Sequence, residues 1–130
     1  MSHPSPLATA PLATPPLAPA LADDGRLPAA ALTAQDHQAT SDLLRALAAP
    51  ARVAIVLALR ERAMCVHELV DALHLNQPQV SQHLKVLKTS GVVEGHRRGR
   101  EVEYVLTDEH IAHIVCDALS HATEGREVDP

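Results

Sequence analysis

A mainly α-helical (α+β) domain with one β-hairpin is the fold class that the sequence predicts. Apolar residues recur at intervals of three and four along most of the chain from Thr40 to Leu119, which is typical of helices with one buried face. The period falls to two only between Val92 and Leu106, where a hairpin is expected. Tyr104 is the single aromatic residue, so leucine, valine, isoleucine and alanine must build the core of one modest domain.

The first three helices are expected between residue 40 and residue 73. Periodicity begins near Thr40 and repeats leucine on one face until Pro50. Proline suits the first turn of a second helix, because its missing N–H is not needed there. That second helix ends in the charged residues 60–62, and a short third helix is expected over Val66–Leu73, where aliphatic residues share one face.

A fourth helix and a hairpin should come next. Asn76 is a good N-cap, and Gly91 should end the helix that begins there. Two segments with a period of two, residues 92–94 and 102–106, then flank a turn in which Gly99 supplies a positive φ.

A terminal helix with one apolar stripe should close the domain. Thr107 is expected to cap it. The resulting order is three helices, a fourth helix after a tight turn, a hairpin and a last helix, which is the layout of a winged helix-turn-helix. The predicted stripe consists of Ile111, Ile114, Val115, Ala118 and Leu119.

Three segments divide the chain. Seven of the ten prolines lie between Pro4 and Pro28, so residues 1–35 are expected to form a disordered Pro/Ala-rich arm. Residues 36–124 should form the DNA-binding and dimerisation domain, and residues 125–130 a tail. The arm lacks the basic start and unbroken apolar run of a signal peptide, and no run is long enough to cross a membrane. With two cysteines only, a cytoplasmic location is expected.

Positive charge gathers in the fourth helix and the hairpin. Between Leu75 and Leu106, five basic and three acidic residues give +2, in a chain of −5. Basic residues neutralise phosphates, and short amide and hydroxyl groups on a helix read base edges in the major groove. We therefore predict binding to double-stranded DNA. The predicted contacts are Gln77, Gln79, Ser81, Gln82, Lys85, Lys88, Arg97, Arg98 and Arg100.

Four potential metal ligands in the terminal helix have an informative spacing. The eleven steps from His110 to His121 leave the two rings about 20° apart on one face but roughly 16 Å apart along the axis. One ion cannot reach both from a single chain, since metal–nitrogen bonds are about 2 Å long. Two such helices packed antiparallel would instead form two sites shared between subunits. The four predicted ligands are Asp108, His110, His121 and Glu124.

Several motifs resemble those of a known family. Residues 47–52 read Leu-Ala-Ala-Pro-Ala-Arg, residues 80–87 read Val-Ser-Gln-His-Leu-Lys-Val-Leu, and residues 91–93 and the 98–100 turn follow. Over about residues 40–124 the chain resembles the ArsR/SmtB family of metal-responsive repressors, and most closely its zinc-sensing branch, the SmtB- and CzrA-type proteins.

The resemblance implies a mechanism of gene control. A homodimer, joined through its first and last helices, would bind an inverted-repeat operator and release it when metal binds at intersubunit sites. The zinc-sensing branch uses Asp, His, His and Glu or His in its terminal helix, which carries over to the four ligands above. Two imidazoles and two carboxylates also suit tetrahedral Zn²⁺, or Co²⁺ as its surrogate.

A second metal site is a further expectation from the resemblance. Relatives with such a site carry a Cys-Val-Cys-Asp or Cys-Val-Gly-Asp run at the start of the third helix. This chain has Cys65, His67 and Glu68 there, but its arm contains no cysteine to complete the set. The alternative is that Cys65 is a small buried thiol that packs as a hydrophobic residue.

Other residues raise three alternative functions. Ni²⁺ or Co²⁺ would replace Zn²⁺ if His113 or the Ser2-His3 segment supplied additional ligands. An oxidant-sensing repressor could use Cys65 and Cys116. A zinc hydrolase needs a general base beside an open site, which the sequence does not offer. The chain is therefore expected not to be an enzyme and to have no small-molecule substrate.

Overall fold

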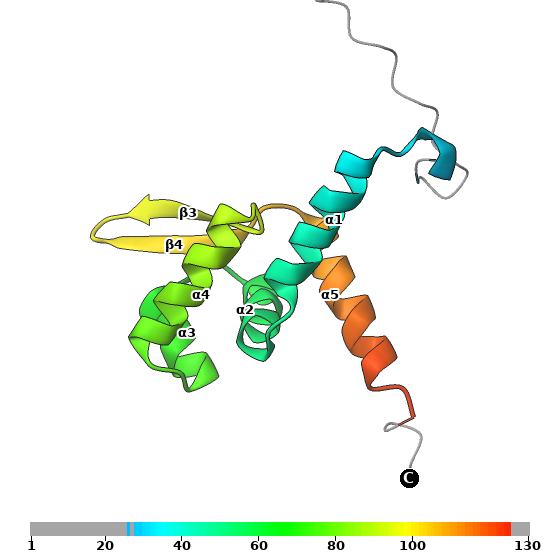
Figure 1. Ribbon diagram of the computed structural model, residues 1–130. Helices are drawn as coiled ribbons and strands as arrows, with labels where there is room; N and C mark the ends of the chain where they lie inside the picture. Colours follow the sequence, from blue (N-terminus) through cyan, green and yellow to red (C-terminus); the bar gives the residue numbers. More distant parts are fainter. Residues whose placement is uncertain (1–25, 27, 126–130) are drawn as a thin grey trace, which may run out of the picture. The chain divides into compact units, whose positions relative to one another are not determined.

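The computed structural model describes Arg26 and residues 28–125. Within this range, five α-helices and a small antiparallel sheet follow the predicted order (Figure 1). The chain divides into two compact units, Met1–His37 and Gln38–Pro130. Most of the predicted arm, including Ser2-His3, and residues 126–130 of the tail lie outside the described residues.

The first unit contains a short 3-10 turn, Ala29–Ala31, and the start of helix α1 (Ala34–Leu47). This helix begins before Thr40, where the periodicity placed it. Thr33 and Asp36 explain the difference, because each side chain accepts a hydrogen bond from the other's backbone N–H, at 2.9 and 3.1 Å. This reciprocal capping starts a helix before its apolar stripe begins.

The second unit contains the helix-turn-helix. Helix α2 spans Pro50–Glu61, α3 spans Val66–Leu73 as predicted, and α4 spans Gln77–Thr89. His74, at φ 58°, ends α3 in the left-handed conformation. Asn76 then caps α4, so three residues, 74–76, turn the chain from α3 into α4, and the two helices pack together.

The sheet has three antiparallel strands in the order β2-β4-β3. Strands β3 (Val93–Arg98) and β4 (Glu101–Leu106) form the hairpin, which we call the wing, and Gly99 has the expected positive φ, at 66°. The strands are longer than predicted, since the wing arginines 97 and 98 lie in β3 rather than in the turn. Strand β2 (Met64–Cys65) was not predicted, because two residues carry no detectable period.

The core lies where α2, α3, α4 and the base of the wing meet. The predicted stripe of α4 is buried as expected. No polar or charged side chain is buried among the described residues. The largest fully buried side chains are Ile55, Leu69, Leu84, Leu87, Val56, Val80 and Val92.

Helix α5 (Glu109–Ala122) closes the second unit and packs against α2. The prediction that Thr107 caps it was wrong. Asp108 is the N-cap, and its Oδ1 accepts hydrogen bonds from the backbone N–H groups of His110 and Ile111, at 2.9 and 3.3 Å. Thr107 instead donates its backbone N–H to the carbonyl of Val92, which ties the end of the wing to its beginning.

The stripe of α5 is only partly covered. Ile111 and Val115 are buried, whereas Ala118 is exposed and Leu119 is 44% exposed. None of the helices in the described part of the chain has the length and apolar character needed to cross a membrane.

Candidate functional site

Helix α4 presents a polar face to solvent. Val80, Leu84 and Leu87 fix the orientation of the helix, because their side chains are buried in the core. The opposite face must then carry the polar positions that the sequence predicted for DNA contact. All nine predicted DNA-binding residues, on α4 and on the wing, are exposed.

Gln79 has a second role that the sequence did not reveal. Its Oε1 accepts the backbone N–H of Asn76 at 3.1 Å, and the Asn76 Oδ1 accepts the backbone N–H of Gln79 at 2.8 Å. This capping box fixes the start of α4. Gln79 therefore positions the helix, and its contact with DNA stays a prediction.

The wing carries three exposed arginines at and beside its turn, Arg97, Arg98 and Arg100. Arg98 forms an ion pair with Glu103 on the neighbouring strand, with Nη1 and Oε1 3.4 Å apart. Within the described residues, Arg97 and Arg100 form no ion pair, so their guanidinium groups are free to meet an anionic surface. Exposed arginines of this kind can contact phosphates beside a helix in the major groove.

The first half of the predicted metal site lies at the start of α5. The Nδ1 atom of His110 lies 3.6 Å from the Oδ1 atom of Asp108, and both side chains are exposed. Capping uses only the Oδ1 atom, so Oδ2 accepts no hydrogen bond among the described residues. Asp108 can therefore cap the helix and offer a carboxylate oxygen to a metal ion at the same time.

The second half lies at the other end of the same helix. His121 belongs to the last turn, Glu124 follows it, and both are exposed. These two residues do not meet Asp108 and His110 within one chain. The only group of three or more potential ligands that converges within the described residues involves other side chains.

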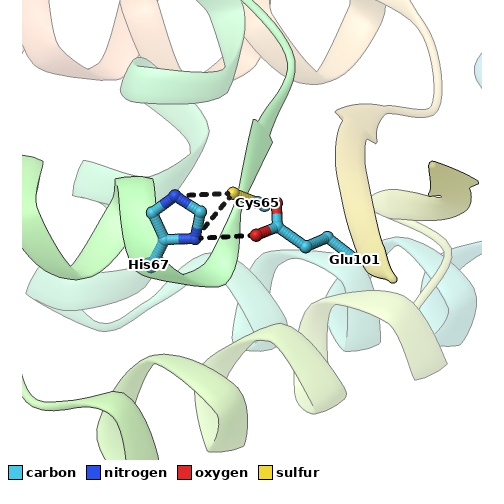
Figure 2. Close-up of side chains that lie close together, drawn as sticks. All are labelled: Cys65, His67 and Glu101. Atoms are coloured by element: carbon cyan, nitrogen blue, oxygen red, sulfur yellow. Dashed lines mark hydrogen bonds and ion pairs between the residues drawn. The ribbon is translucent and has the colours of Figure 1, made fainter. Parts of the chain in front are cut away.

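That group is formed by Cys65, His67 and Glu101, with one ligand atom from each within 4.8 Å of the others. Figure 2 shows the thiol of Cys65 and the carboxylate of Glu101 on the same side of the His67 imidazole, both close to one ring nitrogen. The Cys65 Sγ lies 3.2 Å from Nδ1 of the ring, which lies 3.4 Å from Oε2 of Glu101. The sequence grouped the first two residues correctly but missed Glu101, which only the pairing of β2 with β4 brings near.

Glu68 is not part of this converging group. One of its oxygens accepts the backbone N–H of Cys65 at 3.0 Å, and the other pairs with Arg62 at 3.0 Å. The hydrogen bond from Cys65 and the pairing with Arg62 lower the pKa of Glu68 to about 2. Glu68 therefore acts as a cap of α3. Its Oε1 atom also lies 3.3 Å from the Sγ atom of Cys65, and its role as a metal ligand stays a prediction.

The two cysteines lie in different surroundings. Cys65 is buried, and burial together with nearby carboxylates raises the pKa of its thiol above the ordinary value of 9.0. Cys116, on α5, lines a separate cavity of about 520 Å³ between α2 and α5. Both thiols are free.

An apolar groove runs along α1, α2 and α5 within the second unit. Its volume is about 350 Å³, and every residue that lines it is aliphatic. Leu44 on α1 and Leu119 on α5 border the groove and are 50% and 44% exposed. Apolar surface of this kind is usually covered in the working form of a protein. The lining residues are Leu44, Leu47, Ala48, Val53, Ile114, Val115, Ala118, Leu119 and Ala122.

Comparison with known proteins identifies the family. The model for "Bacterial regulatory protein, arsR family" matches residues 49–94. The chain is 37% identical over 95 residues to the HTH-type transcriptional regulator NmtR of Mycobacterium tuberculosis. The aligned residues cover 73% of this chain and 79% of NmtR. The chain belongs to the ArsR family. The resemblance predicted from its motifs is thereby confirmed.

Within the ArsR family, a higher identity connects the chain to a named repressor. It is 69% identical over 86 residues to the HTH-type transcriptional repressor SmtB of Mycobacterium tuberculosis. The aligned residues cover 66% of this chain. The match spans 64% of the length of that repressor, which is less than two thirds. These ArsR-family relatives are transcription regulators and not enzymes.

A solved ArsR-type structure confirms the fold. The homodimeric winged helix-turn-helix DNA-binding domain of a possible ArsR-family regulator from Mycobacterium bovis superposes with a TM-score of 0.65 at 26% identity. The alignment covers 71% of this chain and 85% of that domain. The predicted winged helix-turn-helix is therefore correct.

Proposed function

We propose that this chain is a metal-responsive transcriptional repressor of the cytoplasm. As a homodimer it binds double-stranded operator DNA with an inverted repeat, and it releases that DNA when Zn²⁺ binds at two intersubunit sites. One observation carries the proposal: α5 presents exposed ligand pairs at its two ends, beside an exposed apolar face.

The groove along α1, α2 and α5 supports the homodimer. The exposed leucines on α1 and α5 would be covered by the same surface of a second chain, as a two-fold interface requires. The Mycobacterium bovis domain, which shares this fold, is described as homodimeric. An antiparallel pairing of two α5 helices would bring Asp108 and His110 of one subunit beside His121 and Glu124 of the other.

The donor set fits zinc. Two imidazoles and two carboxylates give four ligands of the type that tetrahedral Zn²⁺ takes, and the free Oδ2 of Asp108 supplies one of them. A bound ion would supply four directed bonds that join the two terminal helices. Asp108, His110, His121 and Glu124 would then hold the subunits in one relative orientation.

Repression follows from the spacing of the two α4 helices in the dimer. Exposed polar residues of α4 would enter adjacent major grooves, and wing arginines would contact the backbone. A subunit orientation set by the four ligands changes that spacing and so weakens DNA binding. Coupling of this kind is commonly about 1–3 kcal/mol, which corresponds to a 5- to 150-fold change in affinity.

A titration of DNA tests the proposal. A duplex selected from a random pool by the metal-free protein is titrated, with fluorescence anisotropy as the readout, in the presence of chelator or Zn²⁺. We expect zinc to weaken binding by at least about tenfold, and to have no effect on the double variant Asp108→Ala/His121→Ala. Equal affinity with chelator and with zinc would refute the proposed response.

Two alternative signals for the repressor, each sensed through different residues, remain to be compared with zinc. Sensing of Ni²⁺ or Co²⁺ would call for more ligands than four, with exposed His113 as the nearest candidate on α5. Sensing of oxidant through Cys65 and Cys116 is disfavoured, because a buried thiol with a raised pKa is a poor nucleophile. A full zinc response in Cys65→Ser/Cys116→Ser would exclude it.

A further inference from the structure

We propose that Cys65, His67 and Glu101 form a second divalent-metal site, which lies within each subunit and joins the N-terminus of α3 to the wing. The site takes its third protein ligand from β4, and it needs neither the N-terminal arm nor a second subunit. It is independent of the site proposed on α5.

The distances match those between ligands of one tetrahedral ion. Zinc bonds of about 2.0 Å to nitrogen or oxygen and about 2.3 Å to sulfur place neighbouring ligand atoms roughly 3.3–3.6 Å apart. The Sγ–Nδ1 distance is 3.2 Å and the Nδ1–Oε2 distance is 3.4 Å. The third pair, Sγ of Cys65 and the carboxylate of Glu101, lies within 4.8 Å, so rotation of the side chains would bring all three atoms to the distances of one ion.

The fold holds the three residues in place from different elements. Cys65 lies in β2, opposite Glu103 of β4, and its backbone N–H is held by Glu68. His67 lies in the first turn of α3, and Glu101 begins β4. Because the wing pairs with β2, residues 65 and 101 meet although 36 positions separate them in the sequence.

A cavity beside the cluster leaves room for a further ligand. Its volume is about 280 Å³, and the three residues line it together with Gln77, Val102 and Tyr104. Water or the amide oxygen of Gln77 could complete four-coordination, since sites with three protein ligands keep a fourth position open. An exposed His67–Glu101 ion pair alone would not explain why a buried thiol shares the same imidazole.

The donor chemistry selects the class of ion. A thiolate with an imidazole and a carboxylate favours Zn²⁺ or Co²⁺ over Mg²⁺ and Ca²⁺, which prefer oxygen ligands. When the metal–sulfur bond forms, the Cys65 thiol loses its proton to solvent. Gln77 is the first residue of α4, so an ion here would restrain the wing beside the start of the DNA-reading helix.

Cobalt absorption tests the proposal on the full-length chain. The α5 ligands contain no sulfur, so sulfur-to-cobalt charge-transfer absorption must come from one of the two free thiols, and the proposal assigns it to Cys65 rather than Cys116. We expect this absorption in the wild type and in His121→Ala, and its loss in Cys65→Ser. Glu101→Gln and His67→Gln should each weaken cobalt binding at this site by at least about tenfold, which is the least effect expected for a direct ligand.

Two control variants show whether a loss of the absorption is specific to the proposed ligands. Glu103→Gln removes a carboxylate from the same strand, and Cys116→Ser removes the other thiol; both should retain the absorption. Circular dichroism and thermal unfolding confirm that each variant is folded. The proposal is overturned if folded wild-type protein shows no charge-transfer band, if Cys65→Ser keeps it, or if Glu101→Gln binds cobalt like the wild type. Cobalt bound without a sulfur signature would leave the α5 site intact and refute only this one.

Discussion

The guanidinium of Arg52 lies against the imidazole of His83, with Nη1 of the arginine 3.3 Å from Nδ1 of the histidine. The Nε atom of Arg52 also donates a 2.6 Å hydrogen bond to the carbonyl of Ala46, near the end of α1. One side chain of α2 therefore connects α1, which borders the proposed dimer groove, to the DNA-reading helix α4.

This connection predicts an energetic coupling between the two residues. Arg52→Ala should destabilise the protein by about 1.5–3 kcal/mol, because it removes charge-assisted hydrogen bonds of a half-buried group. In a double-mutant cycle with His83→Ala, urea unfolding should give a coupling of at least about 0.5 kcal/mol. Arg45→Ala, which breaks an exposed ion pair with Asp42, should cost less than about 1 kcal/mol. Strict additivity of Arg52→Ala and His83→Ala would contradict the structure.

Two substitutions of Asp108 should separate its role in helix capping from its role in metal binding. Asparagine is as good an N-cap as aspartate, so Asp108→Asn should keep the stability of the wild type while it weakens zinc binding. Asp108→Ala should lose both, with a stability cost of about 1 kcal/mol. Chemical unfolding and zinc competition against a chromogenic chelator measure the two effects. Zinc affinity unchanged in Asp108→Asn would remove this carboxylate from the ligand set.

The DNA-contact residues should fall into two classes. Lys85→Ala, Lys88→Ala and Arg97→Ala should each reduce the slope of log affinity against log salt by about 0.9 for every phosphate that the variant no longer neutralises. Ser81→Ala and Gln82→Ala should keep the slope and change the preferred base sequence. Arg45→Ala, which lies outside this surface, is the control. A single slope for all variants would show that the charged residues do not meet phosphates.

Gly95 should be essential to the wing for steric reasons. A Cβ atom there would lie 2.8 Å from Cγ1 of Val102 and 3.2 Å from Cε1 of Tyr104. Valine is stiff and cannot move aside easily, so Gly95→Ala should destabilise the protein by about 1–3 kcal/mol. The double variant Gly95→Ala/Val102→Ala should be less destabilised than the sum of its single changes. Urea unfolding at fixed protein concentration tests this, and a neutral Gly95→Ala would contradict the packing.

Asp36 should titrate below its ordinary pKa of 3.8. Hydrogen bonds from the backbone and side chain of Thr33 favour its carboxylate and lower its pKa. The capping contribution is therefore fully present above pH 3.8 and is lost as the pH falls through the lowered value. NMR of the carboxyl group should show this, and Thr33→Ala should raise the pKa of Asp36 back toward 3.8. A carboxyl that titrates identically in both proteins would refute the cap.

The helices were predictable because their signals are local. The aliphatic period of α4 and its Asn76 cap defined a buried stripe and a start that the structure reproduces. Features that depend on distant residues were not predictable. Strand β2 exists only because β4 pairs with it, and that pairing brings Glu101 toward Cys65 and His67, where the sequence had suggested only Glu68.

The N-cap of α5 was predicted one residue too early, for a different reason. Thr107 and Asp108 are both good N-caps by composition, and the wing decides between them. The bond from Thr107 to the carbonyl of Val92 keeps Thr107 in the wing, so the helix begins after Asp108. The convergence of ligands between subunits, by contrast, could be argued from spacing alone and stays a prediction.

Mixed dimers distinguish a metal site shared between two subunits from one that lies within a single subunit. In a Cys65→Ser background, one chain carries Asp108→Ala/His110→Ala and the other carries His121→Ala/Glu124→Ala. Each homodimer lacks half the ligands at every shared site, whereas the mixed dimer has a single complete site. The two chains are given different affinity tags so that the mixed dimer can be isolated.

Cobalt binding to the three dimers gives the answer. We expect that neither homodimer binds cobalt tightly and that the mixed dimer binds one ion, with a tetrahedral cobalt spectrum. Weak binding by all three, or tight binding by either homodimer, would contradict a metal site shared between the terminal helices.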